Sequence, residues 1–132
     1  MDKRLAKIDA TILALIHGAF DKNGTLQPFA REIMLIECHI AGISHRELKD
    51  IEPSLLPGVF LVLRREPDNA HDALAIQIHD EAGHHLGYIP RVKNEALARL
   101  MDAGKLLFGQ VQSKEWRGDW LKTEIRVYLR DF

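Results

Sequence analysis

Residues 64–90 decide how this chain folds: Arg64-Arg65-Glu66-Pro67-Asp68-Asn69-Ala70-His71-Asp72-Ala73-Leu74-Ala75-Ile76 and then, after residues 77–85, Leu86-Gly87-Tyr88-Ile89-Pro90. An unbroken apolar run at residues 59–63 precedes this segment and predicts a strand buried on both faces. Within the segment, Leu74, Ile76 and Ile78 alternate with less apolar residues, which predicts a half-buried strand. The intervening loop is rich in Pro, Asp, Asn and His, whose side chains bond to nearby backbone groups. A polar loop held between two strands is a frequent place for a binding site.

Two motifs in this segment resemble those of the HIRAN domain family. The first is R-E-P-D-N-x-x-D-x-x-A-I at residues 65–76, and the second is G-Y-I-P-R at residues 87–91. Part of the likeness continues outward, from the triplet Ile40-Ala41-Gly42 to about Val111, so that it covers roughly half of the chain. The resemblance implies a compact barrel related to OB-like folds.

Length and composition indicate one intracellular domain. The chain has 132 residues, of which 46% are hydrophobic and 28% charged, as in an ordinary soluble globular protein. Its single cysteine, Cys38, excludes an internal disulfide, so we expect a reducing, cytoplasmic location. No apolar run approaches the roughly 18 residues that a membrane span needs.

The charge of the chain is nearly balanced overall but uneven along its length. A net charge of −1 argues against avid, non-specific binding to nucleic acid. Residues 91–132, however, hold nine Lys and Arg against six Asp and Glu. This C-terminal excess of positive charge permits a local patch that faces phosphates.

The first 30 residues are predicted to form a helix and a linker that precede the domain. An apolar stripe at helical spacing runs through residues 3–17, and it consists of Leu5, Ile8, Ile12, Leu15 and Ile16. The sequence leaves open whether this helix packs on the domain or contacts a partner.

Residues 31–132 are predicted to form the domain itself, and most of its elements are strands. Residues 31–43 alternate, which places Met34, Ile36, Cys38 and Ile40 on one face. A helix is expected from Val92 to Gly104, followed by strands at residues 106–115 and 121–129. The predicted fold is mainly β (α+β): a small OB-like or SH3-like β-barrel of about six strands, with one inserted helix and the N-terminal helix.

Asp72 and Asn69 are the loop residues best suited to hold a ligand. A carboxylate accepts hydrogen bonds from a ligand hydroxyl, and the Asn69 amide both donates and accepts. These two side chains, and Asp68, can instead fix the loop through bonds to its own backbone, and the sequence leaves both roles open.

The resemblance implies a ligand for this loop. In the HIRAN domains appended to fork-remodelling helicases, the aspartate at the position of Asp72 binds the terminal 3′-hydroxyl of single-stranded DNA. Aromatic side chains there sandwich the last base, a kind of stacking worth about 1–3 kcal/mol per base. This sequence carries His45, Arg46 and His71 where the family usually carries Phe or Tyr. The hydroxyl-binding half of the site is therefore kept, whereas the stacking half is changed.

From this likeness we predict a non-enzymatic module that binds single-stranded DNA at its 3′ end, in DNA repair or replication-fork processing. Tyr88 and Arg91 occupy positions at which the family contacts the terminal nucleotide and its phosphates, although Tyr88 can equally be a wall of the barrel. Lys93 is expected to face phosphates as well. DNA binding requires Arg64, Arg91 and Lys93 to converge with Arg46 around Asp72.

The alternative prediction is a protein–protein interaction module. Its contact would be made by the N-terminal helix or by the hairpin at residues 116–120. Trp116 and Trp120 flank the turn of this hairpin and either bind a partner or form a cross-strand pair that stabilises it.

Enzymatic and metal-binding functions receive little support from the sequence. It has no G-x-S-x-G, H-E-x-x-H or P-loop motif, so no catalytic residue and no cofactor is predicted. Zinc needs closely spaced ligands, and the adjacent His84 and His85 would face opposite ways on a strand, so no metal is predicted. A metal-dependent hydrolase or nuclease built on Glu66, Asp68 and Asp72 ranks lowest.

Overall fold

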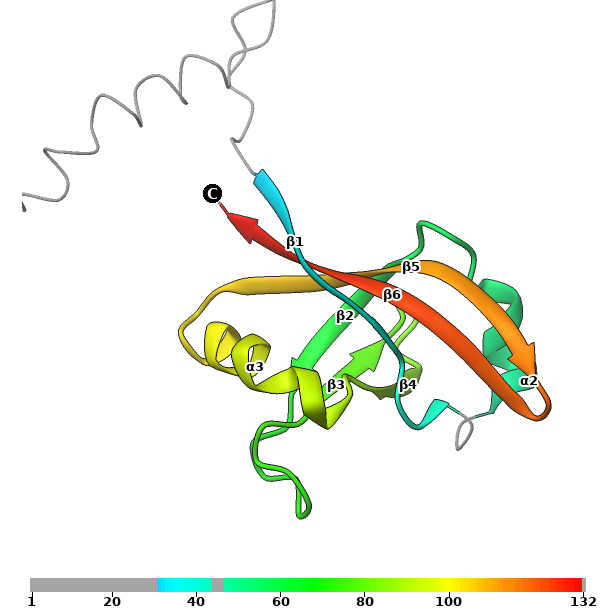
Figure 1. The fold of residues 1–132 in the computed structure, drawn as a ribbon, viewed down its shortest axis with the longest axis horizontal. Helices are drawn as coiled ribbons and strands as arrows, with labels where there is room; N and C mark the ends of the chain where they lie inside the picture. The colour runs from blue at the N-terminus through cyan, green and yellow to red at the C-terminus, as the bar shows by residue number, and fades with distance from the viewer. Residues whose placement is uncertain (1–30, 44–46, 132) are drawn as a thin grey trace, which may run out of the picture. The chain divides into compact units, whose positions relative to one another are not determined.

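A single antiparallel sheet dominates the computed structural model, which describes residues 31–43 and 47–131. Figure 1 shows the sheet curled into a half-barrel, with helix α3 (Asn94–Asp102) and the short helix α2 (Leu48–Ile51) at its sides. The sheet order is β1-β6-β5-β2-β3-β4. These strands are β1 (Arg31–His39), β2 (Phe60–Arg65), β3 (Ile76–His79), β4 (His85–Tyr88), β5 (Leu106–Arg117) and β6 (Trp120–Asp131).

The prediction of a mainly β protein with about six strands is confirmed. The predicted helix and linker of residues 1–30 lie outside the described residues, as do His45 and Arg46. No helix of the described part is both long and apolar enough to cross a membrane.

One bridge joins the two ends of the half-barrel. Ala41, just after β1, exchanges backbone hydrogen bonds with Tyr88 of β4, at N···O distances of 2.8 and 2.9 Å. Gly87 makes this approach possible, because a Cβ there would clash with the Ala41 carbonyl oxygen and lie 2.6 Å from Cγ2 of Ile40. The chain after β1 is thereby fixed beside the end of β4.

The core lies on the concave face of the sheet. The alternation predicted for residues 121–129 is confirmed, since Leu121, Thr123, Ile125 and Val127 are all buried. The prediction that residues 59–63 are buried on both faces is wrong. Only Leu61 and Leu63 are buried, because β2 covers the core with one face and holds Phe60 and Val62 half-buried on the other.

Stacked aromatic rings partly cover the convex face of the sheet. The Phe108 ring lies between those of Phe60 and Tyr128, with centroid separations of 5.1 and 5.2 Å. The Arg130 guanidinium lies over the same ring, 5.1 Å from its centroid. This stack explains how an apolar run can form a strand that buries only one face.

Helix α3 begins two residues later than the sequence predicts. Val92 is 91% exposed, because it belongs to the 3₁₀ turn η3 (Arg91–Lys93) that precedes the helix. The buried side of α3 consists of Asn94, Leu97 and Ala98. A polar residue thus occupies the first buried position of the helix.

The two tryptophans do not form a cross-strand pair. The strand register places Trp116 opposite Leu121 and Trp120 opposite Arg117, so the two indoles lie on different faces of the hairpin. Trp120 packs against the core and meets the His39 ring edge-on at 6.0 Å, whereas Trp116 is half-exposed.

Candidate nucleic-acid interface

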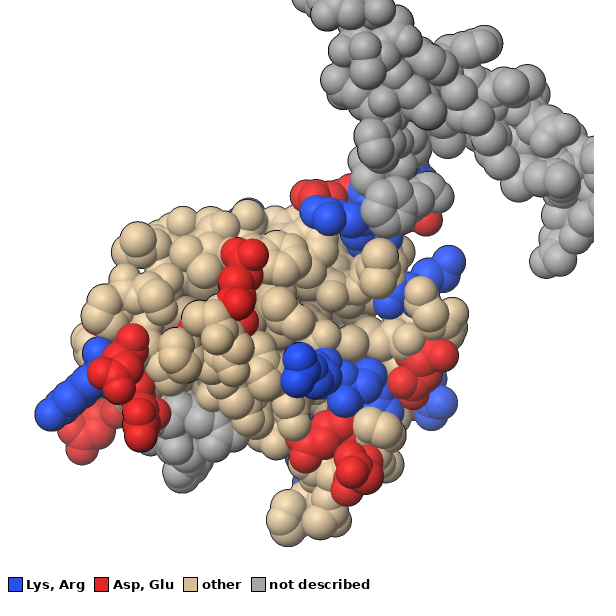
Figure 2. All heavy atoms as spheres, turned by 180° about the vertical axis from the view of Figure 1, so that it is seen from behind, with Lys and Arg blue, Asp and Glu red and all other residues tan. Residues whose placement is uncertain are grey.

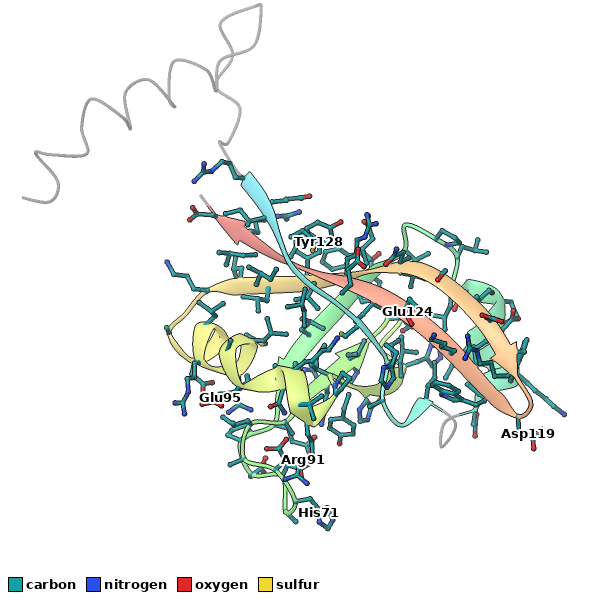
Figure 3. All side chains as sticks on the ribbon, in the orientation of Figure 1. His71, Arg91, Glu95, Asp119, Glu124 and Tyr128 are labelled. Atoms are coloured by element: carbon teal, nitrogen blue, oxygen red, sulfur yellow. The ribbon has the colours of Figure 1, made fainter. Side chains whose placement is uncertain are left out.

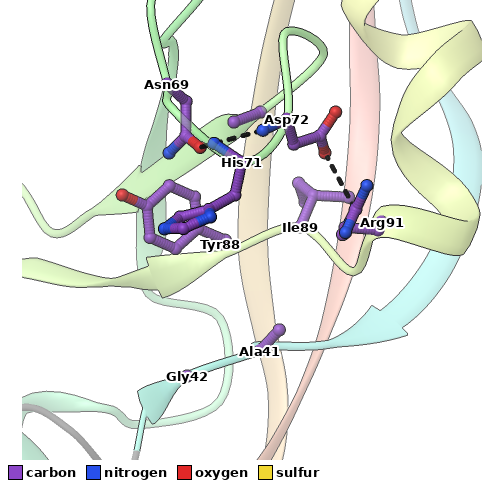
Figure 4. A pocket seen from close by; sticks show the side chains of 9 residues that line it. Ala41, Gly42, Asn69, His71, Asp72, Tyr88, Ile89 and Arg91 are labelled. Atoms are coloured by element: carbon purple, nitrogen blue, oxygen red, sulfur yellow. Dashed lines mark hydrogen bonds and ion pairs between the residues drawn. The ribbon is translucent and has the colours of Figure 1, made fainter.

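A pocket of about 340 Å³ opens between the 66–76 loop, the end of β4 and the chain that follows β1 (Figure 4). The bridge at Ala41 holds two of these walls together. Its lining combines small apolar residues with a few polar groups, as ligand pockets commonly do. The lining residues are Ala41, Gly42, Asn69, His71, Asp72, Ala75, Tyr88, Ile89 and Arg91.

Asn69 organises the loop that forms one wall. Its Oδ1 accepts hydrogen bonds from the backbone N–H groups of His71, at 2.8 Å, and Asp72, at 3.0 Å. Its Nδ2 donates to Oε1 of Glu66 at 3.0 Å. The structure therefore shows Asn69 in the loop-fixing role, one of the two roles that the sequence left open.

Asp72 is held by donors on one side and borders the pocket on the other. Its Oδ1 accepts the Leu74 N–H at 2.9 Å, and its Oδ2 accepts Nδ2 of Asn94 at 2.7 Å. These two donors, with a contribution from Arg91, lower the pKa of the Asp72 carboxyl below its ordinary value. An ionised carboxylate offers about four acceptor positions, so this one retains capacity for a ligand that donates.

Arg91 lines the pocket next to Asp72. Its Nε is 3.7 Å from Oδ2 of Asp72, and the side chain is largely exposed. The pocket thus presents a negative acceptor and a positive donor side by side. Such a pair matches a ligand that carries a hydroxyl next to a phosphate.

Tyr88 is both a wall of the pocket and part of a hydrogen-bond network. Its hydroxyl donates to Oε2 of Glu66 at 2.9 Å, and Nε2 of Gln77 donates to the same oxygen. The Gln77 and Tyr88 donors lower the pKa of the Glu66 carboxyl. Because Glu66 also binds Asn69, it connects the loop to strands β3 and β4.

Arg65 anchors the other side of the loop, a role that sequence reasoning missed. Its guanidinium donates to the carbonyl oxygens of Ala75, at 2.6 Å, and Ala73, at 2.9 Å. Its Nε also donates to Oδ1 of Asp102 at 2.9 Å. The loop is therefore tied to the end of α3 as well as to the sheet.

The structure brings together Asn69, His71, Asp72, Tyr88 and Arg91, but not every predicted site residue. Figure 3 shows His71 and Arg91 at the same end of the domain, well apart from Asp119 in the β5–β6 turn. His45 and Arg46 lie outside the described residues.

Arg64 and Lys93 do not line the pocket. Arg64 is exposed on β2 opposite Gln77, and Nζ of Lys93 donates to the Glu37 carbonyl oxygen at 3.1 Å. The expected convergence of cations is thus limited, among the residues described, to Arg91. The face seen in Figure 2 likewise shows Lys and Arg interspersed with Asp and Glu.

The three carboxylates considered for a nuclease do not gather around one point. Glu66 faces Tyr88 and Gln77, whereas Asp72 faces Asn94 and Arg91. Within residues 31–43 and 47–131, no three His, Cys, Asp or Glu side chains form a group that could hold a metal ion.

Asn94 is the most important site residue that the sequence did not reveal. It is 2% exposed and donates to Asp72 from the start of α3. The sequence contains one indication of this role. Asn94 lies three and four residues before Leu97 and Ala98, hence on the buried side of the helix, and a polar residue there needs a hydrogen-bond partner. The sequence could not say that this partner is Asp72, because 22 residues separate the two.

Comparisons with known proteins show the family and the fold of this chain. The family model of the HIRAN domain matches residues 33–130. A crystal structure of a protein from Lactobacillus plantarum is similar at 26% sequence identity with a TM-score of 0.68, covering 78% of this chain and 99% of that one. The crystal structure of the HIRAN domain of human HLTF is similar in fold at 18% identity with a TM-score of 0.58, covering 75% and 78%. No functionally curated protein matches significantly.

Proposed function

The chain belongs to the HIRAN domain family, and on this premise we propose that it is a non-enzymatic module that binds the 3′ end of single-stranded DNA. The pocket at Asp72 takes the terminal nucleotide. The corresponding setting in the cell is DNA repair or the processing of replication forks, as the family resemblance implies.

The observation that carries the proposal is the state of Asp72. Its carboxylate has a lowered pKa, so it is ionised at neutral pH and can only accept hydrogen bonds. It borders a pocket that the apolar residues Ala75 and Ile89 also line, together with Tyr88. An acceptor at this place favours a free 3′-hydroxyl and repels a 3′-phosphate.

The remaining contacts follow from the positions of the side chains around the pocket. Arg91 has an exposed guanidinium and binds the phosphate of the terminal nucleotide. The rings of His71 and Tyr88 border the space for the base, and imidazole can stack as larger aromatic rings do, with a smaller face. Because Arg91 is the one Lys or Arg that lines the pocket among residues 31–43 and 47–131, we expect modest affinity with a small dependence on salt.

Fluorescence anisotropy tests the proposal with two labelled single strands, one with a free 3′-hydroxyl and one with a 3′-phosphate. Losing a hydrogen bond to a charged group costs about 1.5–3 kcal/mol, which corresponds to roughly 10- to 100-fold weaker binding of the blocked strand. Asp72→Asn removes the charge and should abolish most of this preference. Asp68→Asn is the matched control and should preserve it.

Equal binding of both strands would leave only a general cationic surface and would contradict end recognition. Absence of binding to either strand would favour the alternative, a protein-interaction module. The half-exposed Trp116 is the observation that supports this alternative among the described residues. Trp116→Ala should therefore leave DNA binding unchanged if the pocket is the site.

A further inference from the structure

The Asp72 carboxylate has more acceptor capacity than one 3′-hydroxyl uses. Each of its oxygens accepts one hydrogen bond within the domain, Oδ1 from the Leu74 N–H at 2.9 Å and Oδ2 from Nδ2 of Asn94 at 2.7 Å. A carboxylate oxygen can accept about two hydrogen bonds, so one position remains open on each oxygen. The Nε of Arg91, 3.7 Å from Oδ2, is too distant to fill such a position.

These open positions favour a ligand that brings two donors. The Asp72 side chain is only 15% exposed, so a ligand that fills the pocket displaces the remaining water around the carboxylate. An acceptor that is then left without a donor lowers the affinity. Deoxyribose at a strand end carries the 3′-hydroxyl alone, whereas ribose also carries a 2′-hydroxyl on the neighbouring carbon. Carboxylates bind ribose hydroxyls in this way in dinucleotide-binding folds.

The residues close to Asp72 leave space for the second hydroxyl. Ala75 lines the pocket from the same turn, since its N–H donates to the Asp72 carbonyl oxygen at 3.1 Å. Ala41 and Gly42 line it from the chain after β1 (Figure 4). A hydroxyl needs roughly the volume of one water, about 30 Å³, in a pocket of about 340 Å³. A site that rejects ribose needs a bulky group against the 2′ carbon, and these three positions present none.

The carboxylate is also fixed before a ligand arrives. The Asn94 side chain that holds Oδ2 belongs to a residue that is 2% exposed, and a backbone N–H holds Oδ1. Both open positions are therefore presented together without a prior reorientation of the side chain. A pair of neighbouring hydroxyls then binds at a small cost in ordering.

We propose that the pocket prefers a strand whose last sugar is ribose, with the 2′-hydroxyl donating to one oxygen of Asp72 and the 3′-hydroxyl to the other. The ligand class is thus the terminal 2′,3′-diol of a single strand. Two kinds of strand carry this diol, RNA and DNA that ends in one ribonucleotide. The inference rests on the proposed function, because it places the terminal nucleotide in this pocket.

Fluorescence anisotropy tests the preference with labelled DNA strands that differ only in the last sugar. The strand that ends in ribose should bind about 10-fold more tightly than the strand that ends in deoxyribose, because it adds one hydrogen bond to a charged group. A strand that ends in 2′-O-methylribose should bind no more tightly than deoxyribose, since a methyl ether has no donor. An all-RNA strand of the same sequence separates the two sources of the diol, and it should bind as tightly as DNA with one terminal ribonucleotide.

Asp72→Asn tests whether the carboxylate reads the diol. The amide keeps the shape of the side chain but replaces one acceptor oxygen with a donor, so this variant should bind the ribose and deoxyribose ends equally. Asp68→Asn alters an exposed carboxylate of the same loop and is the matched control, which should keep the 10-fold preference. Circular dichroism of both variants verifies that the sheet is intact.

The outcomes distinguish this inference from the proposed function. If the wild-type protein binds ribose and deoxyribose ends equally and still rejects a 3′-phosphate, the diol assignment is overturned and the proposed function stands. Equal binding of the ribose and 2′-O-methylribose ends would also overturn the assignment, because the gain would not come from a donor. Absence of binding to every strand would overturn both.

Discussion

Gly87→Ala is the most informative single perturbation of the fold, because it tests whether the bridge at Ala41 shapes the pocket. The new methyl group would clash with the Ala41 carbonyl oxygen and lie 2.6 Å from Cγ2 of Ile40. The backbone of Gly87 is not left-handed, so the effect comes from this contact rather than from a strained conformation. We expect the chain after β1 to move away from β4.

The expected loss of stability follows from the contacts that this movement of the chain would break. Two backbone hydrogen bonds join Ala41 and Tyr88, and each is worth about 0.5–1.5 kcal/mol. Overpacking destabilises the folded state by a further amount of about 1–3 kcal/mol. The lower conformational entropy of the unfolded alanine variant offsets about 0.4–1 kcal/mol of this loss. We therefore expect a loss of about 3 kcal/mol of unfolding free energy, within a range of roughly 1–5 kcal/mol, and a fall of about 10–20 °C in Tm for a domain of this size.

Urea denaturation measures this loss, and Gly109→Ala is the matched control in β5. A Cβ at Gly109 would lie 3.3 Å from the Leu61 Cβ and 3.7 Å from the Arg126 carbonyl oxygen. That variant should lose at most about 1 kcal/mol. A Gly87→Ala protein as stable as Gly109→Ala, with unchanged DNA binding, would refute the idea that the bridge holds the pocket in shape.

Three further predictions concern stability, pH and reactivity. Arg65→Ala removes donors from the carbonyl oxygens of Ala73 and Ala75, and urea denaturation should show a loss of about 2–3 kcal/mol, against less than about 0.5 kcal/mol for the exposed Arg64→Ala. The pKa values of Asp72 and Glu66 are lowered from 3.8 and 4.5 in the folded protein, so their stabilising effect is complete above these values and is lost as the pH falls through the folded pKa. As the pH is lowered from 6, the unfolding free energy should therefore begin to decrease at about pH 4.5, and it should decrease less steeply in Asp72→Asn. An equal slope in the two proteins would contradict a stabilising role for the Asp72 carboxylate. Burial raises the pKa of the Cys38 thiol to about 11, so a thiol reagent at pH 8 should label it only after denaturation, and rapid labelling of the native protein would be inconsistent with a buried thiol.

Much of the fold could be predicted because local patterns and the final structure agree. The alternation at residues 121–129 corresponds to β6, and the polar loop between two strands became a wall of the pocket. The run at residues 59–63 was misleading, because an apolar residue can cover the convex face of a sheet under an aromatic stack. Val92 was misleading for a related reason, since a turn residue can share the periodicity of the helix that follows it.

The site was harder to predict because it depends on contacts between distant residues. The loop motif indicated Asn69 and Asp72, but their partners Glu66 and Asn94 are set by the packing of strands and helix. Local sequence also cannot show where a long cationic side chain points. Arg65 turns into the loop while its neighbour Arg64 is exposed, and Lys93 binds β1 instead of facing the pocket.

An NMR titration of backbone amides with a short single strand that carries a free 3′-hydroxyl would locate the DNA-binding site on the protein. We expect the largest chemical-shift changes at the amides of His71, Asp72 and Leu74, around the candidate carboxylate, and at Gly42, which also lines the pocket. The hairpin amides of Trp116 and Trp120 should stay unchanged. Shifts concentrated on the hairpin, or shifts equal for a strand with a 3′-phosphate, would contradict the claim that this pocket recognises a DNA end.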